Sequence, residues 1–507
     1  MAWFEYLLIP FTDPKLFFIA AFGTFAGFII GALPGLSVTM AATLLVSLSY
    51  TWDTIPAIVL IIGVFFGGVY GGSRSAILLN IPGTPSSLAA TFDGYPLAQR
   101  GESGLAIGYA TVYSVLGGLL GIAVLATASP LISSIALSFA PRDYFLMMLL
   151  GILVVGSVGS KDLPKSIFVA GLGMIIGLVG MDSLTGVDRF TFGSVELKGG
   201  INFIACMLGL FGLAEVLHQL RHLKKNRMND ISGQFLPSCA QFLRFLPLSI
   251  RTSAIGVLIG SLPGAGGEIA SLMAYDHAKR TVKKPSRPFG KGAYEGVLAP
   301  DTANMSAIGG ALIPMLTLGI PGDAVTAVIL GGLMIQGLTP GPLLIQSSPD
   351  LFGVIIGAGI ISAVFVFIWG LMGLSTFARI VLIPKHVLLP IIAFLTVVGA
   401  YAIRNSVIDV YWMVIFGVIG YFMKQYRFPT GPMVLGMILG PMMEGHFRRA
   451  IMIEQGSLLG LTTSLFTHPI SFLLTFAIVF TLVTQTPWYV RSKAKLFKQH
   501  QRPAKIE

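Results

Sequence analysis

Charged residues are scarce in this chain of 507 residues: Asp, Glu, Lys and Arg make up 11% of it, against 54% for hydrophobic residues. Globular domains in water carry about 25% charged residues. No charge occurs in 16–52, 104–141 or 351–378, and each run is longer than the roughly 20 apolar residues that span a bilayer. The composition excludes a water-soluble fold. It predicts an all-α polytopic membrane protein with about 10–12 membrane segments, because helices satisfy their own backbone polar groups in lipid.

Residues for metal or covalent chemistry are equally few. The two cysteines, Cys206 and Cys239, have no metal-binding spacing and give no basis for a disulfide. The seven histidines form no metal or triad pattern, and the glycine-rich stretch 63–72 lacks the Gly-Lys-Ser/Thr ending of a phosphate-binding loop. We therefore expect neither an enzyme nor a bound cofactor. Any step that requires energy would draw on a coupling cation, Na+ or H+, or on another subunit.

Glycine and proline, in contrast, are abundant, with 61 and 29 residues. In so apolar a chain they predict close helix packing together with discontinuous helices or re-entrant hairpins. The net charge of +11 is best interpreted as basic cytoplasmic loops rather than as binding of nucleic acid. Residues 1–14 lack a basic region followed by a small-residue cleavage site, so we expect no removable signal peptide.

Two helix-breaking motifs occur twice in the same order. The stretch 31–35, Gly-Ala-Leu-Pro-Gly, returns as Gly-Ser-Leu-Pro-Gly at 260–264, and Ile-Pro-Gly at 81–83 returns at 320–322. Repeated breaks of this kind are typical of transporters built from internal repeats. They divide the chain into a first transmembrane repeat, a basic cytoplasmic linker, a second repeat and a basic C-terminal tail, with bounds of 1–220, 221–245, 246–490 and 491–507.

Loop charge predicts that the two repeats are inverted. The connection 51–54 has no Lys or Arg, whereas its counterpart 279–291 has six. Past the second break the order is reversed, since the polar turn 93–102 contains Arg100 and the stretch 337–348 has no charge. Basic loops stay in the cytoplasm, which places 182–198 outside. The side of the C-terminus stays open: strict inversion puts it outside, while the basic tail favours the cytoplasm unless an additional crossing or re-entrant segment lies within 431–468.

Polar residues gather at the two Pro-Gly breaks, where unpaired helix N–H groups suit a carboxylate and free carbonyls suit a small cation. For any single hydroxyl, a hydrogen bond within its own helix is the commoner role, but repeat-related breaks as a pair favour function. The candidates for substrate binding are Ser73, Arg74, Asn80, Gly83, Thr84, Ser86, Asn304, Pro321, Gly322 and Asp323. The candidates for a Na+ site are Asn80, Asp301, Thr317 and Gly319.

Two of these candidates are lone charges in apolar sequence. Arg74 is the sole charge in 54–92, and Asp323 is the sole charge in 302–349. Arg74 would attract an anionic substrate, pair with Asp323 when the site is empty, or lie near the lipid headgroups with its side chain extended toward water. Glu268, which follows the second Leu-Pro-Gly, is either a further site residue or a helix cap.

Longer motifs in both halves are similar to those of a known family. They are Tyr-Gly-Gly-Ser at 70–73, Ala-Ile-Leu-Leu-Asn-Ile-Pro-Gly-Thr-Pro at 76–85, Asp-Gly-Tyr-Pro at 93–96, Leu-Pro-Gly at 262–264, Gly-Gly-Ala-Leu-Ile-Pro at 309–314, Leu-Thr-Leu-Gly-Ile-Pro-Gly at 316–322 and Gly-Leu-Thr-Pro-Gly-Pro at 337–342. With these motifs the chain resembles, over almost its whole length, the large membrane subunit of the tripartite tricarboxylate transporter family.

The resemblance implies a multi-pass permease of the bacterial inner membrane that imports a citrate-like di- or tricarboxylate by cation-coupled alternating access, with Na+ favoured. It implies two partners, a periplasmic substrate-binding protein and a small four-helix membrane subunit, and it leaves a homo-oligomer open. The motion we favour is an elevator-like shift of the broken hairpins. The main alternative is an anion channel lined by the two Pro-Gly breaks. A non-transporting receptor is a weaker one.

Overall fold

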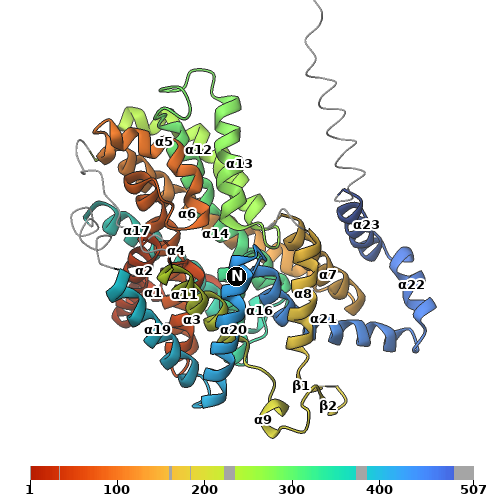
Figure 1. Cartoon of the computed structure of the whole chain (residues 1–507). Helices are drawn as coiled ribbons and strands as arrows, with labels where there is room; N and C mark the ends of the chain where they lie inside the picture. The colour runs from red at the N-terminus through yellow and green to blue at the C-terminus, as the bar shows by residue number, and fades with distance from the viewer. Residues whose placement is uncertain are drawn as a thin grey trace, which may run out of the picture.

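The computed structural model describes residues 2–33, 35–158, 163–182, 184–221, 235–372 and 385–484. This part of the chain is almost entirely helical (Figure 1). Its one sheet pairs β1 (Gly180–Met181) with β2 (Asp188–Arg189) in antiparallel register, with Gly180 opposite Arg189. The prediction of an all-α polytopic membrane protein is confirmed.

Seven helices in the described ranges are long and apolar enough to cross a membrane. They are α2 (Pro14–Ala32), α4 (Thr54–Leu79), α6 (Ser103–Ala136), the continuous segment Phe203–Leu220, α12 (Cys239–Gly260), α17 (Pro349–Met372) and α20 (Val407–Gln425). Within Phe203–Leu220, a π-helical stretch (Leu208–Leu213) joins α10 (Phe203–Met207) to α11 (Ala214–Leu220).

These seven helices, or eight spans if one bent pair is counted, are fewer than the roughly 10–12 membrane segments expected from the sequence, and the other apolar helices of the described ranges are shorter. An α-helix of 11 residues, the length of α3, spans only about 16 Å, roughly half of a bilayer core. α22 and α23 together reach membrane length but are bent by 95° at their junction. The shorter apolar helices are α3 (Val38–Leu48), α8 (Leu163–Gly177), α15 (Ala324–Ile335), α19 (Lys385–Ala402), α22 (Leu458–Thr467) and α23 (Pro469–Thr484).

The remaining helices connect or cover these segments. Two of them, α14 and α21, are long, and α14 is buried along nearly its whole length. Their bounds are α1 (Ile9–Thr12), α5 (Leu88–Gln99), α7 (Pro141–Val158), α9 (Val195–Lys198), α13 (Gly266–Thr281), α14 (Glu295–Leu318), α16 (Leu344–Ser347) and α21 (Gly431–Ile453), with 3-10 helices at Ala2–Tyr6 and Pro85–Ser87.

Glycine brings the backbones of α2 and α4 into direct contact. A methyl group on Gly27 would lie 2.3 Å from the carbonyl oxygen of Val64, and one on Gly31 would lie 2.0 Å from that of Gly68. No side chain fits at such distances, so the two helices can approach this closely only with glycine at these positions. Close approach through small residues is how helices associate in lipid, where burial of apolar surface gives no driving force.

The same contact recurs in the second half between α12 and α14. A methyl group on Gly256 would lie 2.3 Å from the carbonyl oxygen of Ala303, and one on Gly260 would lie 2.5 Å from that of Ala307. Positions 256 and 260 follow 27 and 31 by 229 residues, and 303 and 307 follow 64 and 68 by 239, which are the offsets of the two repeated motifs. The internal repeat seen in the sequence is therefore a repeat of backbone packing.

Two connections that the loop charges assign to one side of the membrane lie together. Arg287, between α13 and α14, forms an ion pair with Glu102, between α5 and α6, at 2.7 Å. α5, α12 and α13 lie at one end of the molecule, and α9, β1 and β2 lie at the opposite end (Figure 1).

Most of the predicted linker, 222–234, and the whole tail 491–507 lie outside the described residues, while the last part of the linker belongs to α12.

The turn expected at 93–102 is confined to the residues after Gln99. The polar sequence 93–102 was expected to form a turn, but α5 extends through Gln99. Asp93 is fully buried, and its Oδ1 accepts hydrogen bonds from the backbone N–H groups of Gly290, Gly292 and Ala293, each at 2.8 Å. The first part of the predicted turn is therefore helix, and Asp93 satisfies N–H groups about 200 residues away, which local composition does not reveal.

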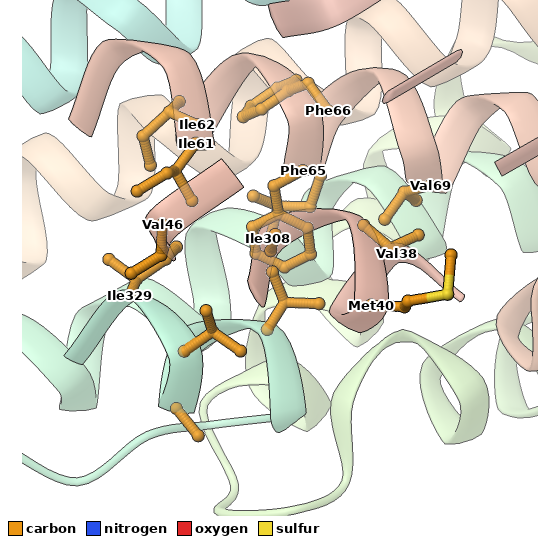
Figure 2. Packing of buried hydrophobic residues seen from close by; sticks show 14 of the residues in the cluster. Val38, Met40, Val46, Ile61, Ile62, Phe65, Phe66, Val69, Ile308 and Ile329 are labelled. Carbon is orange, nitrogen blue, oxygen red and sulfur yellow. The ribbon is translucent and has the colours of Figure 1, made fainter. Parts of the chain in front are cut away.

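The core between the halves is made by α3, α4, α14 and α15. Figure 2 shows Val38 of α3, Phe65 and Val69 of α4 and Ile308 of α14 side by side, with Ile329 of α15 nearby. The first four of these side chains also border the cavity described below. The apolar core therefore continues directly into the wall of that cavity.

Candidate functional site

A cavity of about 420 Å³ lies between the two halves. Within the described ranges, five helices begin at its wall. The residues at these helix starts are Ser37 to Thr39 of α3, Thr84 to Ser86 ahead of α5, Gly264 to Glu268 of α13, Asp323 to Val325 of α15 and Thr430 to Pro432 of α21. A helix start carries unpaired N–H groups and a partial positive charge, so the wall is suited to an anion.

The break in the first half positions Thr84 at this wall. α4 ends at Asn80, whose φ of 55° is the left-handed conformation that Asn tolerates at a helix end. Thr84 then caps the following helix: the Oγ of Ser87 donates to the Thr84 carbonyl at 2.8 Å and accepts from its N–H at 3.3 Å. Thr84 and Ser86 both line the cavity, with their hydroxyl oxygens 3.1 Å apart.

The break in the second half is built in the same way. α14 ends at Gly319, again in the left-handed region with φ 70°, and Asp323 caps α15. The backbone N–H of Thr326 donates to Asp323 Oδ1 at 2.8 Å, and the Thr326 hydroxyl accepts from the Asp323 N–H at 2.9 Å. Positions 323 and 326 follow 84 and 87 by the repeat offset of 239. The repeat therefore places one capping residue from each half on one cavity.

The Pro-Gly residues of the breaks have a structural role. A methyl group on Gly83 would lie 2.1 Å from the carbonyl oxygen of Gly31, and one on Gly322 would lie 2.7 Å from that of Gly260. The N–H of Gly264 also donates to the Gly322 carbonyl at 2.7 Å. Each Ile-Pro-Gly break thus packs on the Leu-Pro-Gly break of its own half. In the first half, Pro34 of the Leu-Pro-Gly break lies outside the described residues. Gly83, Pro321 and Gly322 shape the site but do not line the cavity, and neither does Asn80.

Arg74 does not reach the cavity, and the predicted pair with Asp323 is wrong. Arg74 lies inside α4 rather than at its end, and its side chain is 0% exposed. Its guanidinium donates to the hydroxyl of Tyr70 at 2.8 Å, to that of Thr111 at 3.3 Å and to the carbonyl of Gly370. It also lies 4.9 Å from the Tyr70 ring centre. Sequence proximity to the break suggested a shared site, but the side chain projects toward α6 and α17 instead.

The four predicted Na+ ligands do not meet at one point. Asp301 accepts a hydrogen bond from Ser73 at 2.6 Å and lies within electrostatic range of Arg74. Thr317 donates to the carbonyl of Ile313, at 2.7 Å, within its own helix. Asp301 and Thr317 are separated by about 24 Å along α14 at 1.5 Å per residue. This prediction was wrong because both residues, though polar and near the second break in sequence, lie at different depths of one long helix.

Lys424 is a cavity residue that the sequence analysis missed. It comes from α20, and no other Lys or Arg of the described residues lines the cavity. Its ammonium forms a short ion pair with Glu215 of α11, which accepts a second hydrogen bond from Gln219 at 2.9 Å. Lys424 is the sole charge between Asp409 and Arg427. That isolation was a usable signal, although it gave no sign of which cavity the residue faces.

The fold and the cavity define a multi-pass membrane protein in which helix starts from both halves meet at a cavity, the arrangement of a transporter. The model of the tripartite tricarboxylate transporter TctA family matches residues 17–435. The chain therefore belongs to this family, which is a family of transporters and not of enzymes.

Two similar proteins come from Agrobacterium vitis. One, described as an uncharacterized 52.8 kDa protein in the TAR-I ttuC' 3' region, is 35% identical over 444 residues, which are 87% of this chain and 88% of the relative. The other, from the TAR-II ttuC' 3' region, is 39% identical over 216 residues, which are 43% of this chain and 87% of the relative. No solved structure matches the chain.

Proposed function

We propose that the chain is the large permease subunit of a secondary transporter that imports a di- or tricarboxylate, coupled to a cation gradient with Na+ favoured, by alternating access. The observation that supports it is the cavity at which helix starts from both halves converge. Discontinuous helices whose N-terminal ends point at an anionic substrate are a recurrent way to bind a carboxylate within a membrane.

The cavity offers different chemistry to different parts of such a substrate. The helix starts supply N–H donors, and the hydroxyls of Thr84 and Ser86 add polar contacts. Lys424 supplies a positive charge on the side of α20. Phe65, Val69 and Ile308 form an apolar wall against which a short carbon chain packs. A small acid with two or more carboxylates fits this division.

Family membership supports the proposed partners and location. The family is tripartite, which supports a periplasmic binding protein and a small membrane subunit that act with this chain in a bacterial inner membrane. An elevator-like shift would move the hairpin tips that carry Thr84 and Asp323 relative to the helices that hold Lys424 and the start of α21.

Uptake by the purified chain, reconstituted in vesicles with its membrane partner and binding protein, tests this function. We expect accumulation of a labelled carboxylate driven by an inward Na+ gradient and stimulated by unlabelled substrate inside. Carboxylate movement without this stimulation would indicate the anion channel. Absence of carboxylate movement under any gradient would overturn the proposal.

Thiol labelling tests the position of the site. In a background with the exposed Cys239 replaced by Ser, Ser86→Cys should be inactivated by a small charged thiol reagent, and substrate should slow the reaction. Ser138→Cys is the control, because Ser138 is exposed and does not line the cavity. Equal substrate protection at both positions would place the site elsewhere.

A further inference from the structure

We infer that the cavity holds a site for a hard, oxygen-binding cation, formed by the carboxylates of Glu268 and Asp323 and the amide oxygen of Asn304. These residues come from three elements, α13, the break ahead of α15, and α14, and all three line the cavity. This position differs from the four Na+ ligands predicted from the sequence. The inference deepens the proposed function and, for its role in coupling, rests on it.

The start of α13 lies against Asp323 and Asn304 and carries Glu268 on the same turn. A methyl group on Gly266 would lie 3.1 Å from Asp323 Cβ, and one on Gly267 would lie 2.1 Å from Asn304 Oδ1. Glu268 is the next residue along this turn. The two glycines, one with a φ of 53°, therefore allow the α13 backbone to lie directly against both Asp323 and Asn304, with the Glu268 carboxylate on the same turn.

Asn304 is the member that points most clearly to a ligand. Its side chain is only 2% exposed, yet its Oδ1 accepts no hydrogen bond from any described residue. Native structures rarely leave a buried polar oxygen without a partner, because the hydrogen bonds that it loses to water are then not replaced. A cation bound beside Gly267 would give this oxygen its partner.

Charge in this part of the cavity is unbalanced. Within the described part of the chain, the Glu268 side chain has no hydrogen bond or ion pair, and it is exposed to the cavity. Asp323 uses Oδ1 to cap α15 through Thr326. Lys424, the cavity's basic residue, is already paired with Glu215. Capping explains one oxygen of Asp323 but neither Glu268 nor Asn304.

The donor set is chemically specific. Two carboxylates and an amide carbonyl are oxygen ligands, which Na+, Mg²⁺ and Ca²⁺ prefer, and there is no thiolate or imidazole to favour a transition metal. Among the described residues no group of three or more His, Cys, Asp or Glu residues could hold a metal. A site with only two acidic ligands and an amide suits a hard cation held with moderate affinity.

A cation here would couple its own binding to that of an anionic substrate. Without it, a substrate carboxylate entering the cavity meets two negative charges. With it, the repulsion is offset, so each ligand raises the affinity of the protein for the other by the same factor. On the proposed function, this mutual increase in affinity would couple the movement of the cation to that of the carboxylate.

Thermal unfolding of the purified full-length chain in nanodiscs tests the site without relying on transport. NaCl, KCl or CaCl₂ replaces choline chloride at constant ionic strength. We expect at least one of the three cations to raise the unfolding temperature in a saturable way, because a ligand bound to the folded state stabilises it. No saturable shift with any of them would overturn the inference.

Variants place the site. Glu268→Gln and Asn304→Leu should raise the half-saturating cation concentration by about tenfold or more, the scale of one lost contact to a charged group. Asn304→Asp, which keeps the oxygen and adds charge, should lower it. Asp276→Asn, in the same helix α13 but exposed and paired with Arg280, is the matched control. An equal cation response in the control and in Glu268→Gln would refute the assignment.

The outcomes separate this inference from the proposed function. If the chain accumulates carboxylate but none of the three cations changes its unfolding temperature, the proposed transport function is supported and the cation site is refuted. If a cation raises the unfolding temperature of the parent chain but not of Glu268→Gln, and the parent chain moves no carboxylate, the cation site is supported and the proposed transport function is refuted.

Discussion

Glu102 and Arg287 form a two-point ion pair that joins the two halves of the chain at one end of the molecule. Arg287 Nη2 lies 2.7 Å from Glu102 Oε1, and Nη1 lies 2.9 Å from Oε2. The hydroxyl of Tyr294 donates to the same carboxylate at 2.7 Å. These hydrogen bonds, that from Arg287 foremost, lower the pKa of Glu102 below its usual value.

This ion pair predicts a specific dependence of stability on pH. Because the pKa of Glu102 is lowered on folding, its contribution is complete above the unfolded value of about 4.3 and is lost as pH falls through the lower folded value. Glu102→Gln should therefore lower the unfolding temperature at pH 7. Below about pH 4.3, the unfolding temperature of this variant should fall less steeply with pH than that of the parent protein. Asp276→Asn, which removes an exposed pair with Arg280, should change both little. Thermal scans across pH measure this.

The close packing of backbones at glycine predicts which Gly→Ala substitutions destabilise the protein. Gly31→Ala and Gly260→Ala should each destabilise the protein by about 1–3 kcal/mol, the usual cost of overpacking, because the new methyl groups would lie 2.0 and 2.5 Å from carbonyl oxygens. Gly171→Ala is the control, since no atom lies within 4 Å of its methyl position. Unfolding in detergent measures the difference. Equal stability of Gly31→Ala and Gly171→Ala would contradict the backbone contact of α2 and α4.

Lys424 predicts a charge requirement in the cavity. Lys424→Gln should raise the KM for carboxylate uptake about 10- to 100-fold, the scale of a lost contact to a charged group, while Lys424→Arg should retain part of the affinity. Lys291→Gln, in an exposed connection, should leave KM unchanged. Concentration-dependent uptake in vesicles is the measurement, and an unchanged KM in Lys424→Gln would remove this residue from the site.

The hydrogen bonds of Asp93 hold the connection between α13 and α14 in place, so weakening them should open this connection. Its Oδ1 accepts three backbone N–H groups and its Oδ2 accepts from the Tyr275 hydroxyl at 2.9 Å. Asp93→Asn weakens all these bonds, since charged acceptors bind about twice as strongly as neutral ones. Trypsin should then cleave within 279–291 faster than in the parent protein.

Tyr275→Phe is the graded control for this experiment. It removes one hydrogen bond and leaves the three backbone contacts of Asp93 in place, so cleavage should accelerate less than in Asp93→Asn. The reverse order of cleavage rates would mean that the ring of Tyr275, rather than the carboxylate, holds the connection.

The parts of the fold that the sequence predicted are those set by local chemistry. Long uncharged runs require membrane helices, and the combination of Pro with Gly strongly disfavours continuation of a helix. Thr84 and Asp323 were not matched in the sequence analysis, although the two are separated by the same 239 residues as the repeated Ile-Pro-Gly motifs; the structure shows that they are equivalent. Both are capping residues at the cavity, because a residue that restarts a helix after a break must satisfy its free N–H groups.

The sequence by itself thus determined the class of protein, its repeat and the two breaks that form half of the site. Only the tertiary structure decided which charges share the cavity. Arg74 lies six residues before the first break yet projects into a separate buried cluster, whereas Lys424, more than 300 residues away, lines the cavity. The reason is physical: the direction of a side chain on a helix, and the helix that packs beside it, depend on contacts between segments that no local pattern encodes.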